Sequence, residues 1–310
     1  MTILFTSPTD DAEAWRRMLT AALPEETVRV YPDETVDPAA VDYAVVWHPP
    51  RGLLASLPNL KAIFSMGAGV DHLASDPDLP RDVPVVRMVD DGLTEGMTEY
   101  VVATVLAHHR CLRTYAEQQA AGLWRPLSVP LARNRRVGVL GLGELGRDAA
   151  AALAALRFDV AGWARTHKEV PGVRSYAGPG ALNAFLARSD ILVCLLPLTE
   201  ATRGILGRAT LGALPAGACV VNVGRGGHVV DDDLLDLLDS GHIGEATLDV
   251  FHEEPLPADH RFWTHPRVRV TPHIASVTPP ETAAQVIAAN IARMRQGETP
   301  APIVDFAKGY

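Results

Sequence analysis

The feature that most constrains the fold is a glycine-rich stretch that directly follows a short apolar run. Residues 136–140 are mostly apolar, Gly141, Gly143 and Gly146 follow in the spacing G-x-G-x-x-G, and an alanine-rich segment comes next. This order predicts a β-strand, a tight turn and a helix, with a pyrophosphate held at the helix N-terminus. Glycine spacing alone is equally consistent with an ordinary strand-to-helix turn, so the surrounding sequence has to distinguish the two.

The first hundred residues alternate short β-like runs with helical stretches, which predicts a parallel sheet covered by helices. The expected strands are residues 2–5, 27–30, 43–47, 62–65 and 85–89, and a helix is expected over residues 10–23. A longer helix over residues 97–115 is predicted because apolar residues such as Val101 and Val105 recur there at helical spacing. This helix would lead into a second, independent α/β series.

The second series fits a dinucleotide-binding fold. Its six expected strands are residues 137–140, 160–163, 191–196, 219–223, 246–250 and 268–270. A final amphipathic helix over residues 280–296 carries Ala283, Ile287, Ile291 and Met294 on one stripe. Because this helix follows the completed second sheet, we expect it to return to the N-terminal domain.

Composition excludes several classes of protein. The 310 residues suggest two domains, and the net charge of −9 disfavours a nucleic-acid partner, since a phosphate backbone requires a basic surface. No apolar run approaches the roughly 20 residues of a membrane span, and the N-terminus lacks the features of a signal peptide. We therefore expect a cytoplasmic protein without a membrane partner, whose three cysteines are reduced.

The strand expected over residues 160–163 indicates the cofactor preference. A site selective for NAD places an acid at this strand end, to accept hydrogen bonds from the ribose 2′-hydroxyl. Ala164 stands there instead, and Arg165, Thr166 and Lys168 follow with donors for a 2′-phosphate. This pattern predicts that NADP(H) is preferred over NAD(H), and the alternative is a solvated basic turn.

Three consecutive expected strands are each followed by a polar residue suited to catalysis. Arg225 follows residues 219–223, Glu254 follows residues 246–250, and His273 follows the last strand. Because ligands bind beyond the carboxyl ends of parallel strands, these side chains should converge. Together they suit hydride transfer to a 2-oxo acid: Arg225 binds the substrate carboxylate, His273 is the general acid, and Glu254 orients the imidazole. Taken singly, each residue also has a non-catalytic interpretation. Arg225 would be a surface cation, Glu254 an acid exchangeable with its neighbours, and His273 a loop histidine.

With these motifs in order, the chain resembles the D-isomer-specific 2-hydroxyacid dehydrogenase family over nearly its whole length. The stretches that carry the resemblance are residues 141–146, 196–199, 222–227, 248–257 and 271–275. The resemblance implies an α/β fold with two Rossmann-like, doubly wound parallel-sheet domains and the active site in the cleft between them. It further implies a substrate domain of flavodoxin-like fold, residues 1–97 plus 280–310, a dinucleotide-binding domain, residues 98–279, and a homodimer.

The resemblance also implies particular site residues. The cofactor contacts are expected from Gly141, Gly143, Glu144, Leu145, Gly146, Arg165, Thr166, Lys168, Leu196, Pro197, Thr199, Val223, Gly224 and Asp249, the last near the nicotinamide carboxamide. The substrate contacts are expected from Trp47, Met66, Gly67, Ala68, Gly69, Arg225 and His273. Trp124 is a weaker candidate for the pocket wall, with packing as the alternative. No metal site is expected, because His108 and His109 have no matching ligand cluster.

Within this family, residues 65–71, 97–101 and 163–166 are most similar to members that reduce glyoxylate and hydroxypyruvate, so a small 2-oxo acid is the expected substrate. A larger 2-oxo acid remains the first alternative, because the sequence does not reveal the shape of the pocket. The second alternative is a non-enzymatic, dinucleotide-sensing module like the C-terminal-binding corepressors, which share this scaffold.

Overall fold

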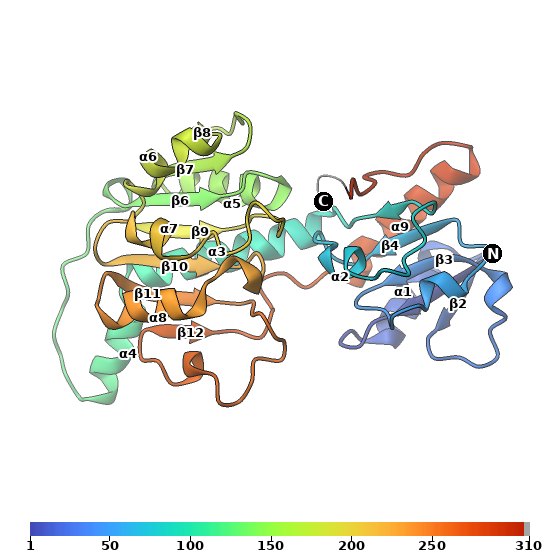
Figure 1. Cartoon of the computed structure of the whole chain (residues 1–310), viewed down its shortest axis with the longest axis horizontal. Helices are drawn as coiled ribbons and strands as arrows, with labels where there is room; N and C mark the ends of the chain where they lie inside the picture. The colour runs from blue at the N-terminus through green and yellow to red at the C-terminus, as the bar shows by residue number, and fades with distance from the viewer. Residues whose placement is uncertain (307–310) are drawn as a thin grey trace. The chain divides into compact units, whose positions relative to one another are not determined.

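The computed structural model describes residues 1–306, and the chain divides into two compact units. Unit 1 consists of Met1–Leu93 and the described residues from Val277 onward, and unit 2 is Thr94–Ser276 (Figure 1). The chain thus passes from one unit to the other twice, once within the first turn of helix α3 (Asp91–His109) and once directly after Ser276.

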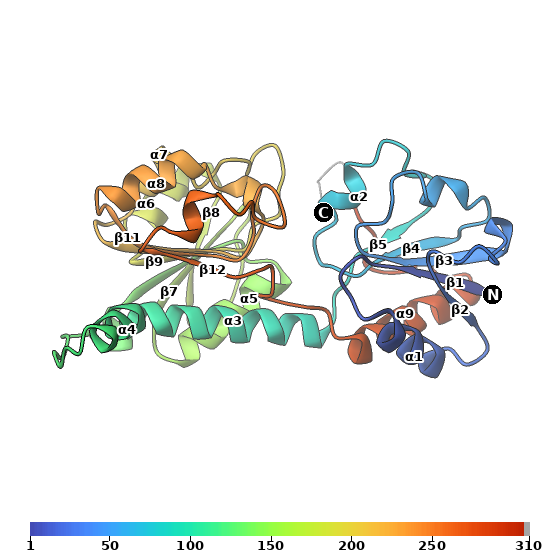
Figure 2. The same ribbon diagram turned by 90° about the horizontal axis from the view of Figure 1, so that it is seen from below.

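Unit 1 is built on a five-stranded parallel sheet with the strand order β2-β1-β3-β4-β5. Its strands are β1 (Thr2–Thr6), β2 (Thr27–Val30), β3 (Val41–Val46), β4 (Ala62–Ser65) and β5 (Val85–Val86). Helices α1 (Ala12–Ala22) and α9 (Pro280–Arg295) pack on one face, and the short α2 (Asp71–Ala74) lies on the other side (Figure 2). Helix α9 is joined to the first part of the chain by an ion pair between Arg295 and the buried Glu26.

Unit 2 is built on a seven-stranded parallel sheet with the strand order β12-β11-β10-β9-β6-β7-β8. Its strands are β6 (Arg136–Leu140), β7 (Asp159–Ala164), β8 (Val173–Ala177), β9 (Ile191–Cys194), β10 (Ala218–Asn222), β11 (Ile243–Leu248) and β12 (Val268–Val270). Its helices besides α3 are α4 (Leu112–Ala120), α5 (Glu144–Ala155), α6 (Leu182–Leu186), α7 (Arg208–Gly212) and α8 (Asp231–Asp239).

Helices cover both faces of this second sheet, which is why its central strands are apolar throughout rather than alternating. Figure 2 shows α3 and α5 on one face and α6, α7 and α8 on the other. Val101 and Val105 of α3 join the buried cluster of the first face, and Leu211 of α7 and Leu234 of α8 join that of the second. The two-sheet α/β fold expected from the sequence is confirmed.

The strand orders locate the places where ligands bind in such sheets. The order of unit 2 reverses between β6 and β9, and that of unit 1 reverses between β1 and β3. Loops diverge there in opposite directions and leave a crevice at the carboxyl ends of the strands. The glycine loop directly follows β6, and Trp47 directly follows β3.

The sequence-based elements were wrong in two places. The single helix expected over residues 97–115 is two helices, because Cys111 adopts a left-handed conformation with φ of 55° that ends α3 and starts α4. The expected six strands of unit 2 are seven: β8 was missed because it is a half-exposed edge strand without a buried apolar run. The cysteines of the described chain are free thiols, as expected, although only Cys194 is fully buried. No helix among residues 1–306 is both long enough and apolar enough to cross a membrane.

Candidate active site

The glycine loop between β6 and α5 has the geometry of a dinucleotide cradle. Gly141 has φ of 101°, and a Cβ there would lie 2.7 Å from the Leu195 carbonyl oxygen. A Cβ on Gly146 would overlap the Gly141 carbonyl, so this glycine lets α5 pack against the strand. In contrast, a Cβ on Gly143 would meet nothing within 4 Å, which leaves open space at the N-cap of α5.

The first amides of α5 face the same open space. Among residues 1–306, the backbone N–H groups of Gly143, Glu144 and Leu145 donate to no protein acceptor, and no side chain caps the helix. Unsatisfied amides at a helix N-terminus bind phosphate groups well. The residues present therefore fit the pyrophosphate of a dinucleotide.

The end of β7 presents the basic turn in a fixed shape. The indole N–H of Trp163 donates to the Gly178 carbonyl at 2.8 Å, and the Gly178 N–H donates to Ala164. Arg165, Thr166 and Lys168 follow as exposed residues, and no acid stands at the strand end. The turn thus offers donors at the place where the ribose of a dinucleotide is expected.

The loop after β10 places Arg225 directly against the loop after β11. A Cβ on Gly226 would overlap the carbonyl carbon of Phe251, so the two loops can touch only because this residue is a glycine. The Arg225 backbone is held by His228, whose Nδ1 accepts the Arg225 N–H at 3.1 Å. Its carbonyl accepts a hydrogen bond from the Asn222 side chain at 2.9 Å. The backbone of Arg225 is therefore held in place on both sides.

Glu254 and His273 form a direct pair. His273 Nδ1 lies 2.7 Å from Glu254 Oε2, and because a carboxylate only accepts, this nitrogen is the donor. Glu254 Oε1 accepts the Phe251 N–H at 2.8 Å. The sequence left open which neighbouring acid would pair with His273, and the structure selects Glu254. Nε2 is the ring nitrogen on the side away from this bond, and both side chains are about a third exposed, at 32% and 35%.

The charges in this cluster influence one another. Burial alone would raise the pKa of Glu254, but the hydrogen bonds from His273 and from the Phe251 N–H, together with the positive charges of His273 and Arg225, lower that pKa below its usual value. Glu254 therefore stays ionised well into the acid range. The guanidinium, carboxylate and imidazole expected from three strand ends do share one electrostatic environment in unit 2.

The loop that carries His273 is held by a buried carboxylate. Asp249 is fully buried, and its Oδ1 accepts the Thr271 hydroxyl at 2.5 Å and the Ile274 N–H at 2.9 Å. Its Oδ2 accepts the Ala275 N–H at 2.8 Å, and its carbonyl accepts the His273 N–H at 2.9 Å. His273 itself has φ of 54°, a conformation that costs a non-glycine residue about 1–3 kcal/mol and persists only where its surroundings impose it. Asp249 thus clamps both sides of a strained histidine.

Burial raises the pKa of Asp249, because its hydrogen bonds and the nearby His273 offset only part of the desolvation cost. The contact of Asp249 with a nicotinamide carboxamide, implied by the family resemblance, stays a prediction. What the structure adds is that the described partners of this carboxylate lie in the loop of residues 271–275.

The long loop between β11 and β12, which carries Glu254, is fastened to both ends of α8. At the N-terminal end, Asp231 lies 3.3 Å from His260 Nε2 and 3.6 Å from His252 Nε2. Burial raises the pKa of Asp231, and both histidines partly offset this effect. The carboxylate thus bridges two points of the loop that flank Glu254.

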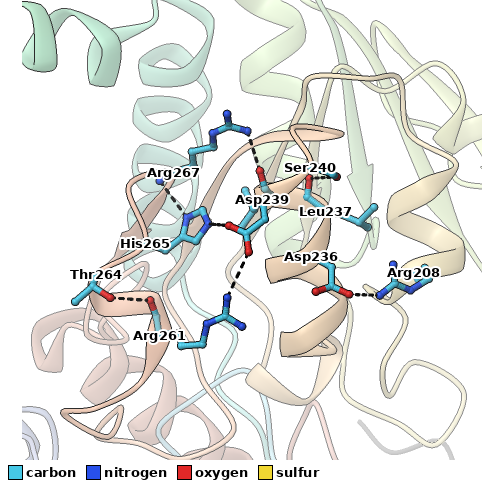
Figure 3. Close-up of polar contacts among 10 residues, drawn as sticks. Arg208, Asp236, Leu237, Asp239, Ser240, Arg261, Thr264, His265 and Arg267 are labelled. Carbon is cyan, nitrogen blue, oxygen red and sulfur yellow. Dashed lines mark hydrogen bonds and ion pairs between the residues drawn. The ribbon is translucent and has the colours of Figure 1, made fainter.

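At the C-terminal end of α8, Asp239 makes the second attachment (Figure 3). One oxygen lies 3.2 Å from His265 Nε2 and the other lies 3.4 Å from an Arg261 nitrogen. Arg267 donates to the carbonyl of Leu238 at 2.8 Å, which satisfies an acceptor of the last helical turn. The loop that carries Glu254 has little regular structure of its own, but it is held at both ends of helix α8.

The remaining predicted cofactor residues lie beside the glycine loop. The segment of residues 196–202 follows β9, and its Pro197 carbonyl accepts hydrogen bonds from Thr202 and His228. Thr199 donates its N–H to Thr202 at 2.8 Å. Val223 and Gly224 follow β10, the neighbour of β9 in the sheet. These residues therefore gather at the carboxyl edge next to the switch point.

In unit 1, the predicted substrate residues also gather at one sheet edge. Trp47 packs its ring against the loop after β4 so closely that a Cβ on Gly67 would overlap it. Met66 is buried, so it can reach a ligand only through its backbone. Ala68 and Gly69 are half-buried, and within residues 1–306 their N–H groups donate to no protein acceptor. This loop can therefore receive an anion in the way expected from its glycines.

Some outcomes concern residues outside this cluster. His108 bonds to Glu245 and Thr247 at 3.1 and 3.0 Å, and His109 packs on Phe158, so both histidines contact residues of unit 2. No group of three or more metal-ligating side chains occurs in the described part of the chain. Three residues of the site were not predicted. Tyr100 and Thr271 act through contacts between separate segments, and His228, which holds Arg225 three positions away, belongs to no pattern that the sequence reveals.

Comparison with known proteins finds relatives over the whole chain. The family described as D-isomer specific 2-hydroxyacid dehydrogenase, NAD binding domain, matches residues 102–275. Glyoxylate/hydroxypyruvate reductase A of Yersinia enterocolitica and that of Serratia proteamaculans are each 43% identical to this chain over the full length of both proteins.

Two solved structures are similar over the whole chain. A D-isomer specific 2-hydroxyacid dehydrogenase from Xanthobacter autotrophicus Py2, in complex with NADPH and MES, is 45% identical with a TM-score of 0.96 and covers 100% of this chain and 99% of its own. An NADPH-dependent glyoxylate/hydroxypyruvate reductase from Sinorhizobium meliloti, in complex with NADP and sulfate, is 41% identical with a TM-score of 0.95 at the same coverage. Because the family model matches more than half of the chain and a full-length relative is 43% identical, the chain belongs to the D-isomer-specific 2-hydroxyacid dehydrogenase family.

Proposed function

We propose that this protein is an NADPH-dependent reductase that converts a small 2-oxo acid, glyoxylate or hydroxypyruvate, to the 2-hydroxy acid. The observation that carries the proposal is the 2.7 Å pair between His273 Nδ1 and Glu254, with the positive charge of Arg225 close enough to lower the pKa of the carboxyl. The substrates named for the 43% identical relatives supply the choice of a small 2-oxo acid.

The three side chains have separate roles in this proposal. When bound, NADPH supplies the hydride for the carbonyl carbon. His273 Nε2 donates a proton to the carbonyl oxygen, so that the product is a neutral hydroxyl and the imidazole becomes neutral. Arg225 binds the substrate carboxylate through its planar fork of donors, and Glu254 fixes the orientation of the His273 ring.

The cofactor is held mainly by unit 2, which we propose is the dinucleotide-binding domain. The amides of Gly143, Glu144 and Leu145 face the pyrophosphate, and the turn of residues 165–168 binds the 2′-phosphate. Leu196, Pro197, Thr199, Val223, Gly224 and Asp249 complete the proposed nicotinamide end of the site.

We propose that unit 1 is the substrate domain. Its contribution is the loop of residues 66–69, whose Ala68 and Gly69 amides are available for a carboxylate. Trp47 fixes the shape of this loop through its contact with Gly67. A small, planar carboxylate suits a site made of backbone amides, because these donors project little beyond the chain.

We further propose a homodimer that uses α4 and the segment of residues 121–131. Trp124 is 99% exposed and Leu123 is 61% exposed, so the packing alternative for Trp124 does not hold within one chain. Leu112, Tyr115 and Leu131 add further exposed apolar area in the same part of the chain. Such a concentration of apolar surface is typical of a protein interface, and we assign it to a second copy of this chain.

The substrate and cofactor proposals are tested in one assay that follows NADPH or NADH oxidation with glyoxylate, hydroxypyruvate, pyruvate and phenylpyruvate. We expect kcat/KM to be highest with the first two acids and NADPH to be favoured over NADH. Preference for phenylpyruvate would replace the small substrate by a larger one. Tight NADPH binding without turnover of any acid would instead support a dinucleotide-sensing module.

In the same assay, Arg165→Ala should reduce the preference for NADPH by about 10- to 100-fold, because a charged hydrogen bond to phosphate contributes roughly 1.5–3 kcal/mol. His167→Ala is the matched control, since it removes an exposed side chain from the same turn. An unchanged cofactor ratio in Arg165→Ala would contradict the assigned phosphate site.

The lowered pKa of Glu254 predicts the acid side of the pH dependence. As a carboxylate, Glu254 accepts the hydrogen bond from His273 Nδ1, and its lowered pKa keeps this acceptor ionised below the usual range of a glutamate. Activity should therefore be lost on the acid side only as Glu254 takes up a proton. Glu254→Gln has no group that titrates there, so its kcat should be lower than that of the parent and should lack this acid limb, which pH–rate profiles measure.

Glu253→Gln is the control for this measurement, because it neutralises the adjacent exposed acid without touching the pair. Its profile should match that of the parent. If Glu254→Gln keeps both the kcat and the acid limb of the parent, Glu254 does not act on the general acid.

The dimer is tested by sedimentation or light scattering. The parent should have twice the mass of one chain, and replacement of Leu123 and Trp124 by serine should shift it toward the monomer, because it removes the most exposed apolar side chains. Trp263→Ser is the control, since Trp263 is 50% exposed but lies outside the α4 region. A parent protein that remains monomeric at micromolar concentration would rule out this proposal.

A further inference from the structure

Tyr100 extends the set of contacts that fix the catalytic loop. It lies on α3, in unit 2, and its hydroxyl is 2.6 Å from the hydroxyl oxygen of Thr271, a residue 171 positions later in the chain. Its ring packs against the buried cluster beneath the sheet, which sets the direction of the hydroxyl. Tyr100 therefore joins a packed helix to the loop that carries His273.

The direction of this hydrogen bond follows from counting protons. Thr271 has one hydroxyl proton, which it donates to Asp249 Oδ1 at 2.5 Å. The Thr271 oxygen can then only accept from Tyr100, so the chain of donation runs from Tyr100 through Thr271 to Asp249. Burial raises the pKa of Tyr100, which keeps this phenol protonated as a donor at neutral pH.

Asp249, the last acceptor in this series of hydrogen bonds, controls the conformation of His273. The Asp249 carboxylate also accepts the N–H groups of Ile274 and Ala275, on the far side of the histidine from Thr271. His273 therefore lies between two anchored points, in a left-handed conformation that its own preferences oppose. If the hydrogen bond from Thr271 to Asp249 is weakened, His273 is the residue expected to leave its strained conformation.

Tyr100 lies near the two segments where the chain passes from one unit to the other. The crossing between the two units occurs at Leu93 and Thr94, at the start of α3, and the second crossing follows Ser276, directly after the catalytic loop. These segments touch, since a Cβ on Gly96 would lie 3.4 Å from the Ser276 hydroxyl. The hydroxyl of Tyr100 thus fixes the histidine loop to α3 close to both crossings.

We propose that Tyr100 is a positioning residue, which holds the His273 loop in its productive conformation by donating a hydrogen bond through Thr271 to Asp249. The inference rests on the proposed role of His273 as general acid. Tyr100 is not assigned any contact with substrate or cofactor, and it acts only through the loop.

The test compares Tyr100→Phe, Thr271→Val and the double variant. Tyr100→Phe should lower kcat by about tenfold, with NADPH affinity unchanged within twofold, because a small displacement of an acid slows proton transfer more than it affects cofactor binding. The solvent deuterium isotope effect on kcat should rise, since proton donation becomes more rate-limiting. In the Thr271→Val background, Tyr100→Phe should cause no further loss.

Hydrogen exchange supplies a readout that does not require turnover. The Ile274 and Ala275 amides, which donate to Asp249, should exchange at least about tenfold faster in Tyr100→Phe than in the parent. Tyr43→Phe is the matched control, because Tyr43 is a buried tyrosine on β3 of unit 1. It removes the same hydroxyl group and should leave both kcat and the exchange of residues 271–275 unchanged.

The outcomes separate this inference from the proposed function. If the parent reduces no 2-oxo acid, the proposed function fails, and exchange of the Ile274 and Ala275 amides still tests the loop. Unchanged exchange in Tyr100→Phe, a kcat within twofold of the parent, or additive losses in the double variant would each overturn the role of Tyr100. A general fall in the melting temperature with no faster exchange in residues 271–275 would show ordinary packing instead.

Discussion

The carboxylate of Asp249 is the interaction on which the rest of the site depends. It is fully buried, and it accepts hydrogen bonds from a threonine hydroxyl and two backbone amides on either side of His273. Ionised acceptors make hydrogen bonds roughly twice as strong as neutral ones, which offsets the desolvation that raises the pKa of this group. The contacts of Asp249 thereby impose the left-handed conformation of His273, which the residue would not adopt by its own preference.

Close contact between backbones brings the other groups to the same place. Gly226 lets the Arg225 loop touch Phe251, and Gly146 lets α5 approach the Gly141 turn. Helix α8 then holds the Glu254 loop through an acid at each end, Asp231 and Asp239. The chemistry expected of Arg225, Glu254 and His273 therefore depends on rigid elements, as a site that must position a proton donor requires.

Much of this arrangement was predictable because parallel sheets place strand ends at one edge. That Arg225, Glu254 and His273 lie in one environment was predictable from the sequence for that reason, and the glycine spacing predicted the turn between β6 and α5. The break at Cys111 was not predictable, because a left-handed residue without glycine leaves no pattern. Strand β8 lacked a buried run, and the bond between Tyr100 and Thr271 joins positions 171 residues apart. Local periodicity contains no information on such a contact.

The most direct test of this account is the Asp249→Asn variant. Its side-chain nitrogen would face the Thr271 hydroxyl or a backbone N–H, so that two donors oppose each other where the carboxylate accepted. We expect kcat to fall at least about 30-fold and the Ile274 and Ala275 amides to exchange faster, as happens when a positioned general acid is displaced. A variant that keeps kcat within threefold, with the exchange of residues 271–275 unchanged, would contradict it.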